Sequence, residues 1–449
     1  MKTPGRVVIC GGGVAAVEAM LALREILAIR PHIDLIAPNE KFIYAPMAVA
    51  EPFGLIETRR FDLAAIAEDL GAELHRGALA RVDGEARQIV LEDGSSLAFD
   101  ATLIAVGAVR KSWLEGALSF GGPPDVGVIA ELLERLERGE VTRLAFVSPP
   151  GLSWTLPLYE LALLTAAHLA ERGIVGVELT VLTAEAEPLK MFGTTAGRML
   201  SDLLSDRGIR LRKGANVQAF AAERLELSSA ESIEVDTVVA LPRLVGPRVE
   251  GLPCDEDGFI LIDDHCRVLG MQDVYAAGDG VAFPIKQGGI ATQQADVAAE
   301  GIAAGLGAPM QPAAFAPLLK GMLLTGVAPL YMRAGSGAES GAGGEVATNA
   351  LWWPPTKIAG RYLGPYLAFA GSLERHIPLA ERPPSERDPQ LVEAAHRDAR
   401  ALALTFAEAD AHSGDFRSAL SWLEIIERLD GVLPPGYLEI RAAWRARLG

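Results

Sequence analysis

The first 40 residues alternate between the hydrophobic spacings typical of strands and of helices. Residues 6–10 are a short, mostly β-branched apolar run, residues 11–13 are glycines, and residues 14–29 place alanine and leucine at helical spacing. Pro31 then ends the helix, and residues 33–36 form the next apolar run. This order predicts a βαβ unit, and hence a parallel sheet that is covered on both faces.

The same pattern recurs in the middle of the chain. An apolar run at 143–147 precedes a Pro-Pro-Gly turn, a predicted helix at 157–172 and a predicted strand at 177–182. One more helix and two more strands follow, at 195–207, 209–213 and 237–241. Between the two units, apolar runs predict strands at 72–82, 88–91, 96–99 and 101–106.

The C-terminal part has the composition of loops and helices. Residues 335–344 are rich in Gly, Ser and Ala and predict a surface loop, and residues 383–386 predict a linker. Beyond it, helices are predicted at 391–412, 416–429 and 437–448. The first two resemble one tetratricopeptide-like hairpin, which cannot bury its own faces. We therefore expect the tail to dock on the body of the protein or on a partner protein.

Charge and cysteine content exclude several function classes. A formal net charge of −17 over 449 residues disfavours nucleic acids as partners and gives no support to contact with an anionic membrane. Cys10, Cys254 and Cys266 form no CxxC pair, which argues for a reducing, cytoplasmic location and against a disulfide scaffold or zinc site. The most apolar long stretch, 152–170, is interrupted by a proline, a glutamate and a histidine, which predicts a buried helix.

The glycine run carries a recognisable chemistry. Gly11, Gly12, Gly13 and Ala16 form a G-x-G-x-x-A pattern between a strand and a helix. The first glycine allows a tight turn, the next of the pattern lets a pyrophosphate approach the backbone, and the small third residue lets the helix sit on the sheet. Amide groups at the helix N-terminus favour phosphate. The pattern predicts a dinucleotide site, with a merely tight turn as the alternative.

One part of such a site is missing. The second strand of a dinucleotide-binding unit usually ends in Asp or Glu, which binds the ribose hydroxyls. Ala37 stands at that place and offers no side-chain acceptor, so Asn39 or Glu40 would have to bind the ribose.

A second motif, residues 273–280, predicts a strand that ends in Gly278 and Asp279. Its carboxylate would accept hydrogen bonds from a polyol such as the ribityl chain of a flavin. Together with the glycine-rich turn and the stretch Leu103–Ala108, which contains Gly107, it resembles the FAD-dependent pyridine-nucleotide-disulfide oxidoreductase superfamily. The resemblance covers roughly residues 5–310 and implies FAD as the cofactor.

The resemblance also implies the architecture. We expect an α/β fold with two Rossmann-like dinucleotide-binding domains, the first interrupted by the second, then a C-terminal cap and a helical tail. The expected ranges are 1–115 and 246–312 for the FAD-binding domain, 116–245 for the second domain, 313–380 for the cap and 381–449 for the tail.

Within the superfamily, the chain is most similar to sulfide:quinone oxidoreductases and type II NADH dehydrogenases. Pro46 resembles a proline beside the isoalloxazine, and Leu79 stands where the main chain contacts adenine in those enzymes. Lys286 and Thr292 lie in a stretch that resembles the entry to the helix facing the flavin pyrimidine ring. A lysine and a helix N-terminus there would stabilise the anionic reduced flavin. The alternative for Lys286 is a solvated loop lysine.

Two departures from the family pattern limit the function. The second glycine-rich turn is replaced by Pro149-Pro150-Gly151, and prolines remove amide donors, while Trp154 occupies space near the pyrophosphate position. Only Glu185 lies near the end of the following strand, which argues against NAD(P)H at this site. Sulfide oxidation would need two cysteines facing the flavin, one near Ser153, and the chain has neither, so persulfide chemistry has no support.

We therefore expect an FAD-dependent oxidoreductase that passes electrons from an unidentified donor to a small-molecule acceptor such as a quinone. Trp352, Trp353, Tyr362 and Tyr366 either line an apolar pocket for a flat acceptor or cap the core. Two alternatives stay open: an NAD(P)H-dependent reductase with an atypical nicotinamide site, and a redox-inactive flavoprotein-derived scaffold that binds a partner protein through its tail. No catalytic side chain and no metal ligand is predicted.

Overall fold

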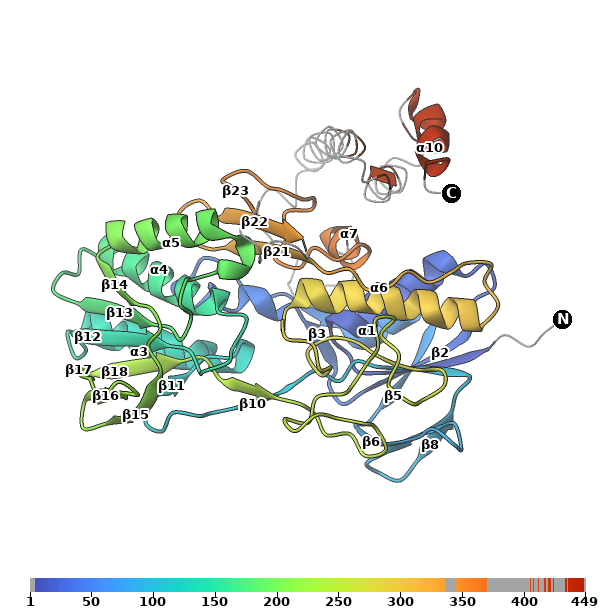
Figure 1. Ribbon diagram of the computed structural model, residues 1–449, viewed down its shortest axis with the longest axis horizontal. Helices are drawn as coiled ribbons and strands as arrows, with labels where there is room; N and C mark the ends of the chain where they lie inside the picture. Colours follow the sequence, from blue (N-terminus) through green and yellow to red (C-terminus); the bar gives the residue numbers. More distant parts are fainter. Residues whose placement is uncertain are drawn as a thin grey trace, which may run out of the picture. The chain divides into compact units, whose positions relative to one another are not determined.

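The computed structural model describes residues 5–335, 344–369 and 435–447, with isolated positions between 404 and 433. The chain divides into two compact units, Met1–Leu351 and Trp352–Gly449. The first unit holds two α/β substructures, each built on one parallel sheet, which we call the first and the second layer (Figure 1).

The first layer is a five-stranded parallel sheet in the order β20-β9-β1-β2-β5. Its strands are β1 (Arg6–Cys10), β2 (His32–Ala37), β5 (Ala72–Arg76), β9 (Ala101–Ile104) and β20 (Val274–Ala276). Strand β20 follows the whole second layer in sequence and pairs beside β9. The expected interruption of the first domain by the second is therefore confirmed.

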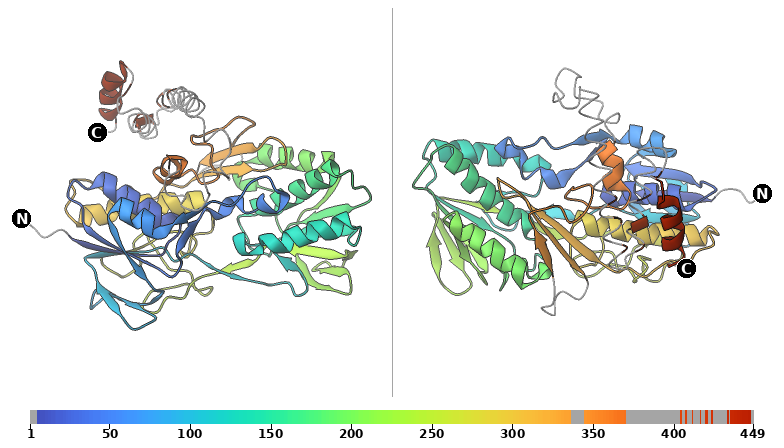
Figure 2. Two further views of the ribbon diagram at one scale, coloured as in Figure 1. Left: turned by 180° about the vertical axis from the view of Figure 1, so that it is seen from behind. Right: turned by 90° about the horizontal axis from the view of Figure 1, so that it is seen from above.

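Helices cover one face of this sheet and a small antiparallel meander covers the other. Helices α1 (Val14–Ile26) and α6 (Gly288–Gly305) lie side by side (Figures 1 and 2), and α2 (Leu63–Leu70) packs beside β5. On the other face, Val8, Cys10 and Ile36 pack against the meander β6 (Leu79–Asp83), β7 (Gln88–Leu91) and β8 (Ser96–Ala98). With both faces covered, the carboxyl edge of the strands is where a ligand site can form.

The second layer repeats this plan with the strand order β11-β18-β12-β13-β14. These parallel strands are β11 (Leu118–Ser119), β12 (Arg143–Val147), β13 (Glu178–Leu182), β14 (Ile209–Arg212) and β18 (Thr237–Ala240). Its helices are α3 (Val126–Glu137), α4 (Leu156–Glu171) and α5 (Thr194–Asp206), and its meander is β15 (Val217–Ala221), β16 (Arg224–Leu227) and β17 (Ser232–Glu234).

Smaller elements complete the first unit. The two segments that connect the layers form an antiparallel pair of strands, β10 (Val109–Lys111) and β19 (Arg243–Val245). A three-stranded antiparallel sheet, β21 (Leu318–Leu323), β22 (Leu330–Gly335) and β23 (Glu345–Ala347), packs near α4, α5 and α6. The remaining pieces are β3 (Lys41–Ile43), β4 (Arg60–Asp62) and short 3₁₀ turns at Ala45–Met47, Glu51–Phe53, Pro123–Asp125 and Lys190–Phe192.

The second unit has helices α7 (Leu363–Phe369) and α10 (Tyr437–Arg445) among its described residues. Trp353 packs there with Ala407, Leu423 and Leu433. The indole nitrogen of Trp352 donates a 2.8 Å hydrogen bond to the carbonyl oxygen of Thr356. The predicted linker at 383–386 and helices at 391–412 and 416–429 lie wholly or mostly outside the described residues, as does most of the loop at 335–344.

Most predicted elements are present, with shifted ends. Strands 88–91 and 143–147 have the predicted bounds, while the helix predicted at 14–29 ends at Ile26. The single strand predicted at 72–82 is two strands, separated at Gly77 and Ala78, because the chain leaves the sheet there to begin the meander. The domain ranges given above stay predictions.

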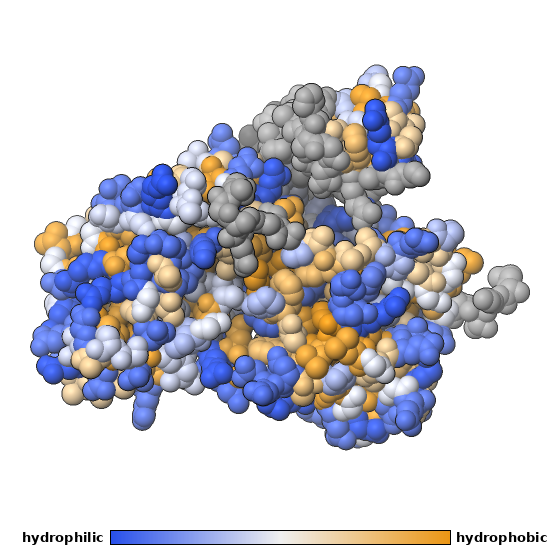
Figure 3. All heavy atoms as spheres, viewed as in Figure 1, coloured by the Kyte–Doolittle hydropathy of each residue, from blue (hydrophilic) through white to orange (hydrophobic). Residues whose placement is uncertain are grey.

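The apolar stretch around α4 is a buried helix, as predicted. Glu160 on this helix is fully buried, and its carboxylate accepts a 2.8 Å hydrogen bond from the amide of Leu324. Among the described residues, no helix combines the length and hydropathy needed to cross a bilayer. Hydrophilic side chains are spread over much of the face seen in Figure 3.

Candidate functional site

A cleft of about 600 Å³ opens at the carboxyl edge of the first sheet. Its wall includes the segments that follow the five strands: residues 11–15, 37–39, 77–80, 105–107 and 277–279. Because the strands are parallel, these five segments, distant in sequence, meet at one edge. The glycine-rich turn and the Gly-Asp motif therefore face the same space.

The three glycines of the turn differ in the space available for a side chain. Gly11 has φ +128°, and a Cβ there would lie 2.2 Å from the carbonyl oxygen of Ala105. A Cβ on Gly12 would lie 2.7 Å from Leu63. At Gly13, which caps the N-terminus of α1, a Cβ would meet nothing within 4 Å. The fold itself thus requires Gly11, and a side chain at Gly12 would displace Leu63, whereas Gly13 leaves open space at the amide end of the helix.

The Gly-Asp motif forms the opposite part of the wall. The amide of Gly278 donates a 2.9 Å hydrogen bond to the side-chain oxygen of Gln294 on α6. The Gln294 amide nitrogen is buried without a hydrogen-bond partner among the described residues. Burial raises the pKa of Asp279, while the positive charges of Lys286 and Arg110 act in the lowering direction. Gln294 itself does not line the cleft, so this donor does not report on a ligand bound there.

The cleft carries a charge opposite to that of the chain. Lys41, Arg110 and Arg248 line it, and Asp279 is its one carboxylate among the described lining residues. A net positive cleft in a chain of formal charge −17 favours an anionic ligand such as a diphosphate.

The cleft also exposes apolar side chains that the protein itself does not cover. Ile43, Val106 and Val109 are 37–46% exposed, and all line the cleft. Exposed branched side chains inside a concave site provide contact area for a flat ring system.

The predicted site residues divide into two groups. Eight line the cleft: Gly11, Gly12, Gly13, Asn39, Leu79, Gly107, Gly278 and Asp279. Of the two alternatives for the missing ribose acceptor, Asn39 lines the cleft and Glu40 does not. Four do not reach its wall: Ala16, Pro46, Lys286 and Thr292.

Physical reasons explain these four positions. Ala16 is fully buried, as a small residue between helix and sheet must be, and Pro46 lies one residue beyond the lining residue Ala45. Thr292 is fully buried and its hydroxyl donates a 2.9 Å hydrogen bond to the carbonyl oxygen of Gly289. The side chain of Thr292 therefore cannot contact a ligand in the cleft.

Lys286 is neither in the cleft nor a solvated loop lysine. Its ammonium lies 3.7 Å from the centroid of the Phe259 ring and donates a hydrogen bond to the carbonyl oxygen of Val281. It lines a second pocket of about 400 Å³ with Phe259, Phe283 and the turn 149–153. Burial lowers the pKa of Lys286 to about 8, although Asp279 and Asp255 act in the raising direction.

Glu185, the carboxylate closest to the end of strand β13, is hydrogen-bonded by other groups of the protein. Glu185 Oε2 accepts hydrogen bonds from the hydroxyls of Thr155 (2.8 Å), Tyr159 (2.6 Å) and Thr183 (3.1 Å), and Oε1 accepts one from the amide of Leu189 (2.9 Å). The only carboxylate that sequence reasoning offered for a ribose at this site is thus already saturated. Trp154 packs on Phe192 with ring centroids 5.9 Å apart.

The cysteines stand apart from this chemistry. Cys10 and Cys266 are buried, and burial raises the pKa of each thiol to about 12, whereas Cys254 is exposed. All three are free thiols and none lines the cleft or the second pocket. A thiol held protonated is a poor nucleophile.

Sequence reasoning did not identify Lys41, Arg110, Arg248 and Gln294. Lys41 and Arg110 lie on the short strands β3 and β10, and Arg248 lies in a loop. No periodicity marks any of the three, although Lys41 and Arg110 follow the carboxyl ends of predicted strands closely. Gln294 lies in the quoted stretch 284–295, but nothing in its sequence position shows that it faces Gly278.

Comparison with known proteins finds related sequences. Residues 161–299 match the family model described as pyridine nucleotide-disulphide oxidoreductase. An NADH dehydrogenase-like protein of Mycobacterium tuberculosis is 29% identical over 303 residues, which cover 62% of this chain and 73% of that protein. The ferredoxin reductase component of a chlorobenzene dioxygenase from a Cupriavidus species is 26% identical over 311 residues, covering 63% and 68%.

Solved structures share the fold. The sulfide:quinone oxidoreductase of Aquifex aeolicus superposes with a TM-score of 0.67 at 17% identity, covering 77% of this chain and 87% of that one. A ferredoxin reductase of Rhodopseudomonas palustris superposes with a TM-score of 0.56 at 18% identity, covering 73% and 82%. These similarities confirm the resemblance inferred from the motifs: residues 161–299 match the pyridine nucleotide-disulphide oxidoreductase family model, and the solved structures share the fold.

Proposed function

We propose that the protein is an FAD-dependent oxidoreductase whose cleft binds one FAD along the carboxyl edge of the first sheet. The observation that carries the proposal is that the open amide end of α1 at Gly13 and the carboxylate of Asp279 line the same cleft. In this arrangement the amides of α1 bind the pyrophosphate, and Asp279 accepts hydrogen bonds from the ribityl hydroxyls.

The cleft fits this cofactor in size, charge and polarity. A volume of about 600 Å³ lies within the range of small-molecule sites. Lys41, Arg110 and Arg248 offset the charge of a diphosphate. Ile43, Val106 and Val109 provide uncovered apolar surface.

When bound, FAD supplies the two-electron chemistry, and the residues of this chain bind it, orient it and set the charge around it. Asp279 is partly exposed in the cleft wall and desolvation raises its pKa, so a hydrogen bond from a ribityl hydroxyl would lower the cost of keeping its carboxylate ionised. No catalytic side chain is assigned.

We propose that the electron donor is not NAD(P)H bound in the usual way by the second domain. The supporting observation is the saturation of Glu185 together with the prolines at 149 and 150, which leave the turn with few donors or acceptors for a nucleotide. The acceptor is proposed to be a small molecule such as a quinone.

An NAD(P)H-dependent reductase is the second candidate. Relatives with names such as NADH dehydrogenase-like protein and ferredoxin–NAD(+) reductase subunit favour it. The second pocket beside Lys286 is a place where a nicotinamide could approach without using Glu185.

A visible absorption spectrum of the purified protein, followed by anaerobic titration with NADH, NADPH and sulfide, tests these proposals. We expect flavin bands that none of the three reagents bleaches quickly. Rapid bleaching by NADH or NADPH would establish the second candidate, and rapid bleaching by sulfide would contradict the argument from the missing cysteines. A colourless protein that FAD does not reconstitute would instead support a redox-inactive scaffold.

A further inference from the structure

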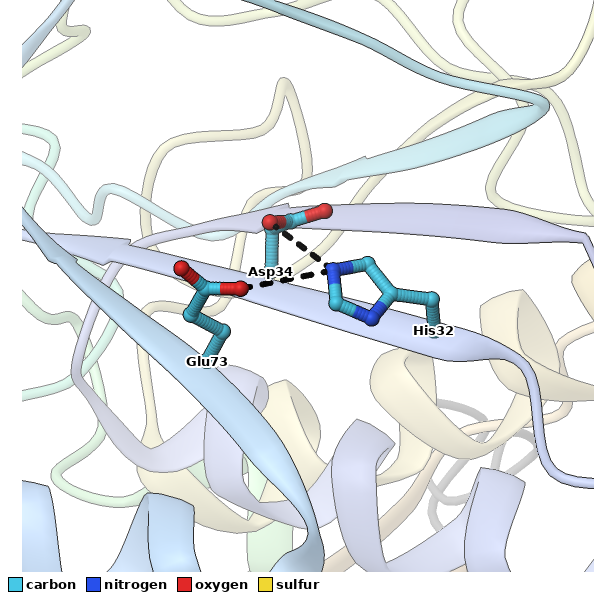
Figure 4. A group of neighbouring side chains, drawn as sticks. All are labelled: His32, Asp34 and Glu73. Carbon is cyan, nitrogen blue, oxygen red and sulfur yellow. Dashed lines mark ion pairs between the residues drawn. The ribbon is translucent and has the colours of Figure 1, made fainter.

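A separate group of titratable side chains lies on the first sheet, away from the residues that line the cleft. His32 and Asp34 are on β2 and Glu73 is on the edge strand β5, where it is the register partner of Asp34. In Figure 4 the three side chains converge, with one ring nitrogen of His32 directed toward both carboxylates. Regular backbone on two paired strands fixes the Cα positions of all three.

The distances among these groups are those of ligands that share an ion. His32 Nε2 lies 3.4 Å from Asp34 Oδ1 and 3.6 Å from Glu73 Oε2. Both separations exceed the mode for a hydrogen bond, about 2.9 Å. Two ligand atoms bound at tetrahedral angles to one zinc ion lie about 3.4 Å apart. One ligand atom from each residue falls within 4.8 Å of the other two.

Asp34 is already oriented by other side chains. Its side chain is fully buried, and the Arg6 guanidinium donates to both of its oxygens, at 2.6 Å and 2.9 Å. His75 Nε2 lies 2.7 Å from Oδ1. Carboxylates that bind metals are commonly held by such surrounding hydrogen bonds, which fix their direction. The Arg6 pair also reduces the negative charge of the group, which favours moderate rather than very tight ion binding.

We propose that His32, Asp34 and Glu73 form a binding site for a divalent transition-metal ion of the zinc class. An imidazole nitrogen with two carboxylate oxygens suits zinc better than magnesium or calcium, which prefer oxygen ligands alone. The side chains of His32 and Glu73 are 49% and 61% exposed, so an ion can enter and water can complete its coordination. The bound ion links β2 to the edge strand β5, independently of the cleft.

Another group, Asp263, Asp264 and His265, is the natural rival. Its residues are consecutive on one turn, where Asp263 Oδ1 accepts hydrogen bonds from the amides of His265 and Arg267, each at 2.9 Å. His265 Nδ1 lies 2.7 Å from Asp264. Only the β2–β5 group is held on two paired strands, so we assign the ion to that site.

The test is calorimetric titration of zinc chloride into the full-length, chelator-treated protein, in a Cys254→Ser background that removes the one exposed thiol. We expect one ion per chain. His32→Ala and Glu73→Gln should each weaken binding at least tenfold. Both side chains are largely exposed, so these variants should keep the wild-type melting temperature in the absence of metal. Titration with Co²⁺, followed by its visible absorption, reports nitrogen and oxygen coordination directly.

His265→Gln is the matched control and should bind zinc as the parent does. The proposal is overturned if the parent protein shows no saturable binding at micromolar zinc. It is equally overturned if binding survives in His32→Ala and Glu73→Gln, or is lost in His265→Gln.

Discussion

The hydroxyl of Tyr159 on α4 donates a 2.6 Å hydrogen bond to Glu185, just beyond the end of β13. Burial and the negative charge of Glu185 both raise the pKa of Tyr159, which keeps the hydroxyl protonated as a donor. Two threonine hydroxyls and one backbone amide complete the shell of Glu185. The carboxylate therefore joins α4, β13 and the following loop within the second layer.

Glu185→Ala should destabilise the protein without changing its response to pyridine nucleotides. Loss of a part-buried, charged hydrogen-bond acceptor costs about 2 kcal/mol, measurable as a lower free energy of unfolding in urea. Glu187→Ala, at a largely exposed position, is the control and should change that free energy by less than about 0.5 kcal/mol. A Glu185→Ala protein of normal stability that loses reduction by NADH would show that Glu185 binds a ribose.

Two neighbouring glycines should give opposite results. Gly11→Ala places a methyl group against the carbonyl of Ala105 at a positive φ, so we expect a loss of at least about 2 kcal/mol in unfolding free energy. Gly13→Ala meets open space, so the FAD-free protein should keep its stability within about 1 kcal/mol. The methyl group would instead intrude on a bound pyrophosphate and weaken FAD binding roughly tenfold or more, by about 1.4 kcal/mol. Unchanged FAD affinity in Gly13→Ala would count against the assigned position of the pyrophosphate.

Asp279 should make the FAD-free protein less stable as the pH rises. Because burial raises its pKa, the folded protein keeps this proton to a higher pH than the unfolded chain does. Stability is then lost as the pH rises from the ordinary carboxyl value, near 4, through the raised folded value. Asp279→Asn should remove this loss, while Asp206→Asn, at an exposed position, should retain it. Denaturation curves at several pH values check the prediction, which fails if the two variants behave alike.

Asp236 should show the reverse pH dependence. Burial acts to raise its pKa, but hydrogen bonds from Thr142 and Arg143, five in all between 2.7 and 2.9 Å, outweigh burial and lower it. Its stabilising effect is therefore present above the ordinary carboxyl value and is lost as the pH falls below it. Asp236→Asn should lower the unfolding free energy by about 2 kcal/mol at pH 7, and the difference should shrink below about pH 4. A constant difference across that range would contradict the ionic origin of the effect.

The sequence predicted an element with the correct ends where an apolar run was bounded by turn residues. The strands at 88–91 and 143–147 are apolar runs closed by turn residues, and both have the predicted ends. Helix α3 was not predicted, although Ile129, Leu132, Leu133 and Leu136 follow helical spacing and are buried. This signal was present in the sequence and was overlooked.

The site was predictable only in part, because proximity arises from topology. Gly13 and Asp279 were placed together by the resemblance to a family, and β20 does return beside β9 to bring them to one cleft. The side-chain direction of Lys286 depends on Phe259, a contact that no local pattern specifies. Arg110 and Arg248 were missed for the same reason.

Titration of FAD into flavin-stripped protein, followed by flavin absorbance, tests the central claim most directly. We predict saturation at one FAD per chain and at least tenfold weaker binding to Asp279→Ala. Absence of saturable FAD binding, or equal affinity in Asp279→Ala, would contradict a flavin that extends from Gly13 to Asp279.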